Sequence, residues 1–151
     1  MRSHAARELA RLGAVAAAPH VAKLADDPAE RVRMTALLAL GALNAPGFER
    51  TLVAGLDDPA PIVRCCAAEA LARIGGKDAI PALRKTLNED PDAEVRLYAA
   101  ESLVVLGDEE ARDRVPAALK AMSWWLRGRP RWKRLRKTAE TGEPLTPWIW
   151  P

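Results

Sequence analysis

Aromatic residues are scarce in this sequence of 151 residues. They make up 5% of the chain, whereas apolar residues as a whole make up 49%. A core must therefore be built from Ala, Leu, Val and Ile. Because Ala and Leu lose little side-chain freedom in a helix, and because the residues that favour sheets are sparse, the composition predicts an all-α fold.

Long uncharged apolar runs are also missing. No stretch of about 18 such residues occurs, so no membrane-spanning helix is expected. The N-terminal stretch MRSHAARELARLG carries charges where a signal peptide needs an apolar core, which makes the cytoplasm the expected location. The two cysteines, Cys65 and Cys66, are adjacent and would point about 100° apart on a helix. They lack the spacing of a zinc or redox site and are expected to pack as small helix residues.

The residue patterns of common catalytic sites are absent. The histidines, His4 and His20, lie on different predicted helices and do not form a metal-ligand motif. Gly75, Gly76 and Lys77 lack the preceding glycine of a phosphate-binding loop and follow a predicted helix. No serine lies in a nucleophile-elbow motif. We therefore predict no catalytic, cofactor-binding or metal-binding residue and no small-molecule substrate.

One segment recurs four times at nearly constant spacing. The copies are MRSHAARELARLG, VRMTALLALGALN, VRCCAAEALARIG and VRLYAAESLVVLG, and they start at Met1, Val32, Val63 and Val95. Such periodicity is typical of stacked repeats. In each copy the first, fifth, ninth and twelfth places are mostly apolar and form one stripe along a helix. The stripe predicts that Leu40, Leu71 and Leu103 are buried.

The segment ends carry the signals of helix boundaries. The copies end in residues that tolerate a left-handed backbone, namely Gly13, Asn44, Gly75 and Gly107. An Asp-Pro step precedes the last three copies and offers a capping carboxylate. Shorter helices are predicted over 14–25, 46–56, 77–87 and 109–122. A hairpin of about 31 residues is too small to bury its own apolar face, so three full hairpins and a half repeat at each end must stack.

The pattern D-P-x-x-x-V-R-x-x-A-A-x-x-L-x-x-L-G resembles HEAT repeats, most closely the short bacterial type of the phycobilisome-lyase HEAT-like proteins. The resemblance covers residues 1–122 and implies a right-handed α-α superhelix. It also implies a structural ladder of Asp and Arg residues along the stack. The matching pairs, each six residues apart, are Asp27 with Arg33, Asp58 with Arg64, and Asp90 with Arg96. A role repeated in every unit is architectural, not catalytic.

Residues 123–151 form a second region, a basic C-terminal tail that contains all five tryptophans. The tail has seven Lys or Arg against two Glu, whereas residues 1–122 have 16 Lys or Arg against 18 Asp or Glu. Three roles remain open: the tail caps the end of the stack, binds nucleic acid through its cations and a stacking Trp, or lies on an anionic membrane surface. The residues concerned are Arg127, Arg129, Arg131, Trp132, Lys133, Arg134, Arg136 and Lys137.

The fourth, seventh and eleventh places of the repeated helices adjoin the buried stripe and are expected to face the inner curve. We predict a partner-binding surface there, formed by Thr35, Leu38, Cys66, Glu69, Arg73, Tyr98 and Glu101. Apolar groups beside mixed charges suit a protein segment better than a phosphate backbone. The sequence therefore favours a non-catalytic protein-binding scaffold. The alternatives are a nucleic-acid-binding protein that uses the tail, and an accessory subunit or fragment of a larger, lyase-like HEAT-containing enzyme.

Overall fold

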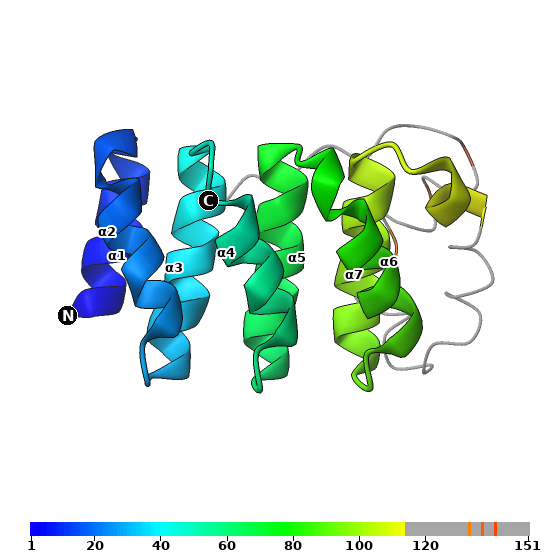
Figure 1. Cartoon of the computed structure of the whole chain (residues 1–151), viewed down its shortest axis with the longest axis horizontal. Helices are drawn as coiled ribbons and strands as arrows, with labels where there is room; N and C mark the ends of the chain where they lie inside the picture. Colours follow the sequence, from blue (N-terminus) through cyan, green and yellow to red (C-terminus); the bar gives the residue numbers. More distant parts are fainter. Residues whose placement is uncertain (114–132, 134–136, 138–140, 142–151) are drawn as a thin grey trace.

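The computed structural model describes residues 1–113 together with Lys133, Lys137 and Thr141. Within residues 1–113 every regular element is helical, as the composition predicts. The helices of the four repeated segments alternate with the helices between them, and short 3-10 turns extend the latter (Figure 1). We call the first set the longer helices and the second set the shorter ones, although α1 and α6 both have 10 residues. The longer helices are α1 (Arg2–Arg11), α3 (Glu30–Leu43), α5 (Pro61–Ile74) and α7 (Ala93–Val105). The shorter elements are η1 (Val15–Ala17), α2 (Ala18–Lys23), η2 (Leu24–Asp26), α4 (Glu49–Ala54), η3 (Gly55–Asp57), η4 (Lys77–Ala79) and α6 (Ile80–Glu89).

The longer helices stand side by side in the order α1, α3, α5, α7, and we refer to them as the long-helix row (Figure 1). Each shorter helix packs against the longer helix that follows it, so α2 contacts α3, α4 contacts α5 and α6 contacts α7. These contacts define three hairpins preceded by the unpaired helix α1. The predicted α-α solenoid, with a half repeat at its start, is confirmed. Helical structure resumes at residue 109, and the end of the predicted second half repeat lies outside the described residues.

The core includes stripe residues of the second, third and fourth copies, whereas Met1 and Leu12 of the first copy are 107% and 68% exposed. Leu40, Leu71 and Leu103 are all fully buried. The longer helices also bury side chains outside the stripe, such as Leu37 and Leu97. This wider burial follows from the stacking, because an inner helix of the row contacts a helix on either side and a shorter helix behind it.

Small residues bring α3 and α5 close together. A Cβ atom added to Gly41 would lie 2.8 Å from Cα of Ala70, a distance that real side chains do not tolerate. The absence of a side chain at residue 41 therefore sets the separation of these two helices.

The predicted helix ends are confirmed. Gly13, Asn44, Gly75 and Gly107 all have left-handed backbones, with φ of 65°, 47°, 69° and 78°. The prediction that the Asp-Pro carboxylates cap the longer helices is wrong. Oδ1 of Asp58 accepts a hydrogen bond from the N–H of Ala60, whereas α5 begins at Pro61 and has Ala60 at its N-cap position. The carboxylate thus stabilises the turn before the helix.

Asp92 is the residue that caps α7. Its carboxylate accepts hydrogen bonds from the N–H groups of Glu94 and Val95, at 2.8 and 3.3 Å. Among the described residues, no helix is long and apolar enough to cross a membrane.

Candidate functional site

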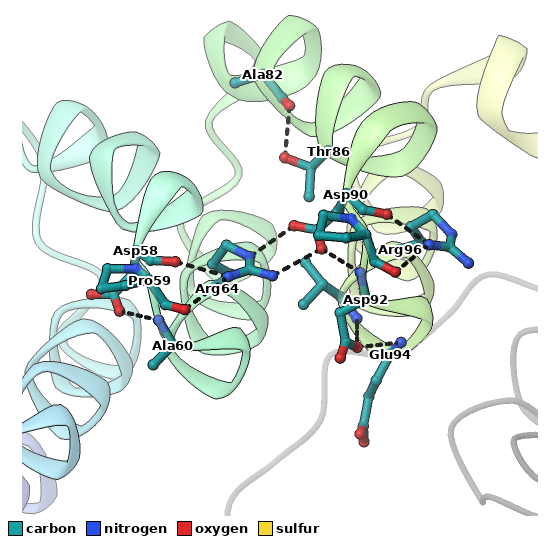
Figure 2. A network of polar contacts seen from close by, with 12 residues as sticks. Asp58, Pro59, Ala60, Arg64, Ala82, Thr86, Asp90, Asp92, Glu94 and Arg96 are labelled. Carbon is teal, nitrogen blue, oxygen red and sulfur yellow. Dashed lines mark hydrogen bonds and ion pairs between the residues drawn. The ribbon is translucent and has the colours of Figure 1, made fainter.

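Ion pairs connect successive hairpins along the edge of the stack that carries the Asp-Pro turns. Nε and Nη2 of Arg33 donate to the two carboxylate oxygens of Asp58, at 2.7 and 3.0 Å. Arg64 holds Asp90 in the same way, at 2.8 and 3.0 Å (Figure 2). In both cases the arginine binds the carboxylate of the following hairpin.

The third donor group of each arginine contacts the turn of its own hairpin. Nη1 of Arg64 donates to the carbonyl oxygens of Asp58 and Pro59, at 2.9 and 3.4 Å (Figure 2). Nη1 of Arg33 donates to those of Asp27 and Pro28, at 3.0 and 3.2 Å. Each arginine therefore bridges two successive Asp-Pro turns.

The predicted pairs six residues apart meet through the backbone and not through the carboxylate, so this detail of the prediction is corrected. The reason is that the carboxylate of Asp58 is already used by the N–H of Ala60 and by Arg33 of the preceding hairpin. Arg64, the arginine of its own hairpin, donates to the carbonyl oxygen of Asp58 instead.

Sequence reasoning missed the first pair of this series. Arg2 holds Asp27 with Nε at 2.9 Å and Nη2 at 3.2 Å. The signal was present, because Arg2 occupies the second place of its copy, as Arg33 and Arg64 do in theirs. We use the term Asp–Arg ladder for the three pairs Arg2–Asp27, Arg33–Asp58 and Arg64–Asp90.

The inner pairs of the ladder are shielded from water. The side chains of Arg64 and Asp90 are 11% and 6% exposed, whereas that of Arg2 is 61% exposed. Burial raises the pKa of the Asp58 carboxyl, but hydrogen bonds from Arg33 and from the Ala60 N–H lower it by more, so this pKa lies below its ordinary value. The hydrogen bond with Asp90 raises the pKa of Arg64. Asp58 and Arg64 are therefore both charged at neutral pH.

A further ion pair follows α7. Arg84 on α6 donates to both carboxylate oxygens of Asp108, and its Nη1 lies 2.6 Å from a carboxylate oxygen of Glu110. The hydrogen bond from Arg84 lowers the pKa of Asp108. This contact fixes the start of the segment after α7 against the last described hairpin.

A groove lies between the first two helices of the long-helix row. Its volume is about 520 Å³, and its lining includes the predicted residues Thr35 and Leu38. The residues that α1 and α3 contribute are Arg7, Glu8, Ala10, Arg11, Thr35, Leu38, Ala39 and Ala42. An apolar floor of alanine and leucine thus lies beside two guanidinium groups, of which that of Arg11 is paired with Glu8 at 2.9 Å.

The remaining predicted surface residues differ in accessibility. Glu69 and Arg73 form an ion pair at 3.0 Å on α5, with side chains only 12% and 15% exposed, and Tyr98 on α7 is partly buried. Cys66 and Glu101 are only 6% and 5% exposed. The expectation that all seven side chains present open contact surface is therefore wrong for these two, because packing covers them.

Most of the basic tail lies outside the described residues, including Trp132 and the five arginines Arg127, Arg129, Arg131, Arg134 and Arg136. Lys133 and Lys137 are described, and both are exposed. No group of three His, Cys, Asp or Glu side chains converges as a metal site in the described part of the chain. Cys65 and Cys66 are buried, at 2% and 6% exposure.

Comparison with known families agrees with the positions of the hairpins. A family profile described as "HEAT repeats" matches residues 49–129, which is more than half of the chain. A second profile, described as "HEAT repeat", matches residues 17–45. No curated protein matches the chain.

Proposed function

Because this chain belongs to the HEAT-repeat family, we propose that it is a non-catalytic scaffold that binds a partner protein along its long-helix row. Stacked helical repeats generally expose an extended surface that serves protein interactions. The family alone does not identify the partner, because one scaffold can carry many functions. The groove between α1 and α3 is the feature that indicates a binding surface.

The apolar floor of this groove is the observation that carries the proposal. Leu38, Ala39 and Ala42 line one side, and Ala10 lies on the other. Burying an apolar side chain against such a floor contributes roughly 25 cal/mol for each Å² removed from water. A partner segment with one apolar anchor residue would therefore gain affinity here.

The charges beside the groove indicate the chemistry of that segment. Arg7 lines the groove, and its guanidinium contacts Nδ1 of His4 at 3.2 Å. An acidic residue next to the apolar anchor would pair with Arg7 and complete the contact. We propose that the occupant is a peptide segment of this composition.

The mixed charge of the row favours protein over nucleic acid as the ligand. Glu8 lies in the groove, and Glu69 faces Arg73 further along. A phosphate backbone is bound best by an unbroken basic surface. Nucleic-acid binding through the tail would be a separate activity of residues 123–151.

We also propose that the repeats are of the short phycobilisome-lyase HEAT-like type. The D-P-x-x-x-V-R pattern supports this assignment, because its Asp and Arg are the residues that form the Asp–Arg ladder. The assignment concerns the repeat and implies no lyase reaction.

The experiment is a peptide selection on the intact chain, followed by affinity measurements with two variants. Leu38→Glu places a charge on the groove floor, and Ile62→Glu makes the same chemical change at a 42% exposed residue outside the groove. We expect Leu38→Glu to weaken the selected peptides by at least about tenfold, as loss of an anchor contact does, and Ile62→Glu to leave them unchanged.

Equal binding by wild type and Leu38→Glu would show that the groove is not the binding surface. A chain that selects no peptide, but retains DNA or RNA oligonucleotides in a salt-dependent manner, would replace the proposal with nucleic-acid binding.

A further inference from the structure

Arg96, at the second place of the fourth copy, makes only the backbone half of the contacts that Arg33 and Arg64 make. Its Nη1 donates to the carbonyl oxygens of Asp90 and Pro91, at 2.6 and 3.1 Å. Arg64 makes the equivalent contacts and adds two hydrogen bonds to a carboxylate. Figure 2 shows the difference, since Arg64 lies between two turns whereas Arg96 contacts only the turn that precedes it.

In Arg33 and Arg64, the edge formed by Nε and Nη2 binds a carboxylate. In Arg96, no carboxylate among the described residues contacts this edge. The fixed Nη1 contacts hold the guanidinium plane in place, and Arg96 is only partly buried, so an incoming group can reach this edge. A guanidinium edge with two parallel donors matches a carboxylate in a bidentate manner.

The sequence does not supply this carboxylate at the expected spacing. Each ladder aspartate follows its arginine by 25 or 26 residues. The same spacing after Arg96 leads to residues 121 and 122, which are Ala121 and Met122. Neither residue can accept the hydrogen bonds that Asp58 and Asp90 accept through their carboxylates.

A second copy of this chain is also a poor donor. Its Asp-Pro turns carry Asp27, Asp58 and Asp90, and each of these carboxylates already holds an arginine. Donating one of them to another molecule would break an existing pair, two of which are shielded from water. An Asp-Pro turn of this chain could therefore reach Arg96 only by breaking an existing pair, whereas an Asp-Pro turn of a different protein would break none.

We propose that Arg96 is a preformed binding site for an aspartate carboxylate, presented in an Asp-Pro turn of a partner protein that continues the Asp–Arg ladder. Because the guanidinium is already held by two carbonyl oxygens, little side-chain freedom is lost on binding. The site lies on the edge of the Asp-Pro turns and does not depend on the groove between α1 and α3.

The test uses the full chain labelled with ¹⁵N and follows the arginine Nε–H signals by NMR. The probe is a blocked peptide with the sequence of residues 88–94, NEDPDAE, which contains the turn that Arg64 binds. A peptide with Asp90→Asn keeps the other acidic residues and serves as the matched control. Sodium acetate supplies a carboxylate without a turn, and sodium chloride controls for ionic strength.

We expect the NEDPDAE peptide to shift the Arg96 signal toward those of Arg33 and Arg64, while the Arg64 signal stays in place. The Arg96→Gln variant identifies the signal by its loss. The Arg96→Lys variant, which keeps the charge without the paired donors, should bind the peptide about tenfold more weakly.

Three results would overturn the proposal. The first is an Arg96 signal that neither the peptide nor acetate moves at millimolar concentration. The second is an equal shift by the Asp90→Asn peptide, which would reduce the effect to general attraction of acidic chains. The third is a peptide no more effective than acetate, which would remove the role of the turn. A Leu38→Glu variant should leave all these shifts unchanged. A negative result at Arg96 can therefore be told apart from a negative result for peptide binding in the groove.

Discussion

The guanidinium of Arg64 holds the carboxylate of Asp90, 26 residues later in the chain, through two parallel hydrogen bonds of 2.8 and 3.0 Å. The pair joins the start of α5 to the turn that leads into α7. It therefore reports directly on the docking of one hairpin against the next, and substitutions there should measure that docking.

We expect Arg64→Ala to lower the free energy of unfolding by about 2 kcal/mol, because it leaves the shielded carboxylate of Asp90 without its partner. The equivalent change Arg2→Ala should cost less than about 1 kcal/mol, since the side chain of Arg2 is 61% exposed. Urea unfolding of both variants and of wild type provides the comparison. Equal losses at the two sites would mean that shielding does not determine the strength of the ladder.

Acid should weaken the stack. The carboxyl pKa values of Asp58 and Asp108 lie below their ordinary value of 3.8. Each carboxylate therefore contributes stability that is fully present above pH 3.8 and is lost as the pH falls through the lower pKa of the folded state. Unfolding measured in urea between neutral pH and pH about 3 should show this decline. Asp58→Asn cannot take up the proton and should show a shallower decline, and an unchanged slope would exclude Asp58 as a contributor.

Gly41→Ala tests the close approach of α3 and α5. Alanine normally stabilises a helix relative to glycine by up to about 1 kcal/mol. At residue 41 the new methyl group would lie 2.8 Å from Cα of Ala70, and a backbone atom cannot move aside as a side-chain end can. We expect a net loss of about 1–3 kcal/mol from overpacking.

Gly76→Ala is the matched control for this change. Gly76 has a φ of −70°, and its nearest neighbouring side-chain atom would lie 3.5 Å from the new Cβ. Thermal unfolding should therefore show no loss of stability for Gly76→Ala. A Gly41→Ala variant as stable as wild type would show that the two helices can separate at no cost.

The fold could be predicted because each repeat carries the same local sequence signals for helix phase and helix ends. The stripe that contains Leu40, Leu71 and Leu103 and the left-handed residues at the helix ends recur in register, and all are confirmed. Helix phase and helix termination depend on neighbouring residues in the sequence, so they can be read without knowledge of the packing.

The side-chain partners could not be predicted in the same way. The spacing of six residues brings Arg64 near Asp58, but whether the carboxylate or the carbonyl is available depends on how the next hairpin docks. Similarly, helix phase placed Thr35, Cys66 and Glu101 on one surface, whereas only the packing determines that the last two are covered. The groove between α1 and α3 also requires the distance between the two helices, which no local pattern gives.

The exposure of Arg2 has a consequence for how the molecule opens. The ladder pair that joins α1 to the next hairpin is the most hydrated of the three. In a stack where each unit contacts mainly its neighbours, the unit with the most exposed contacts is expected to exchange its amide protons first. Transient detachment of α1 would dismantle one wall of the groove while leaving α3, α5 and α7 folded, so occupancy of the groove and protection of the α1 amides should rise and fall together.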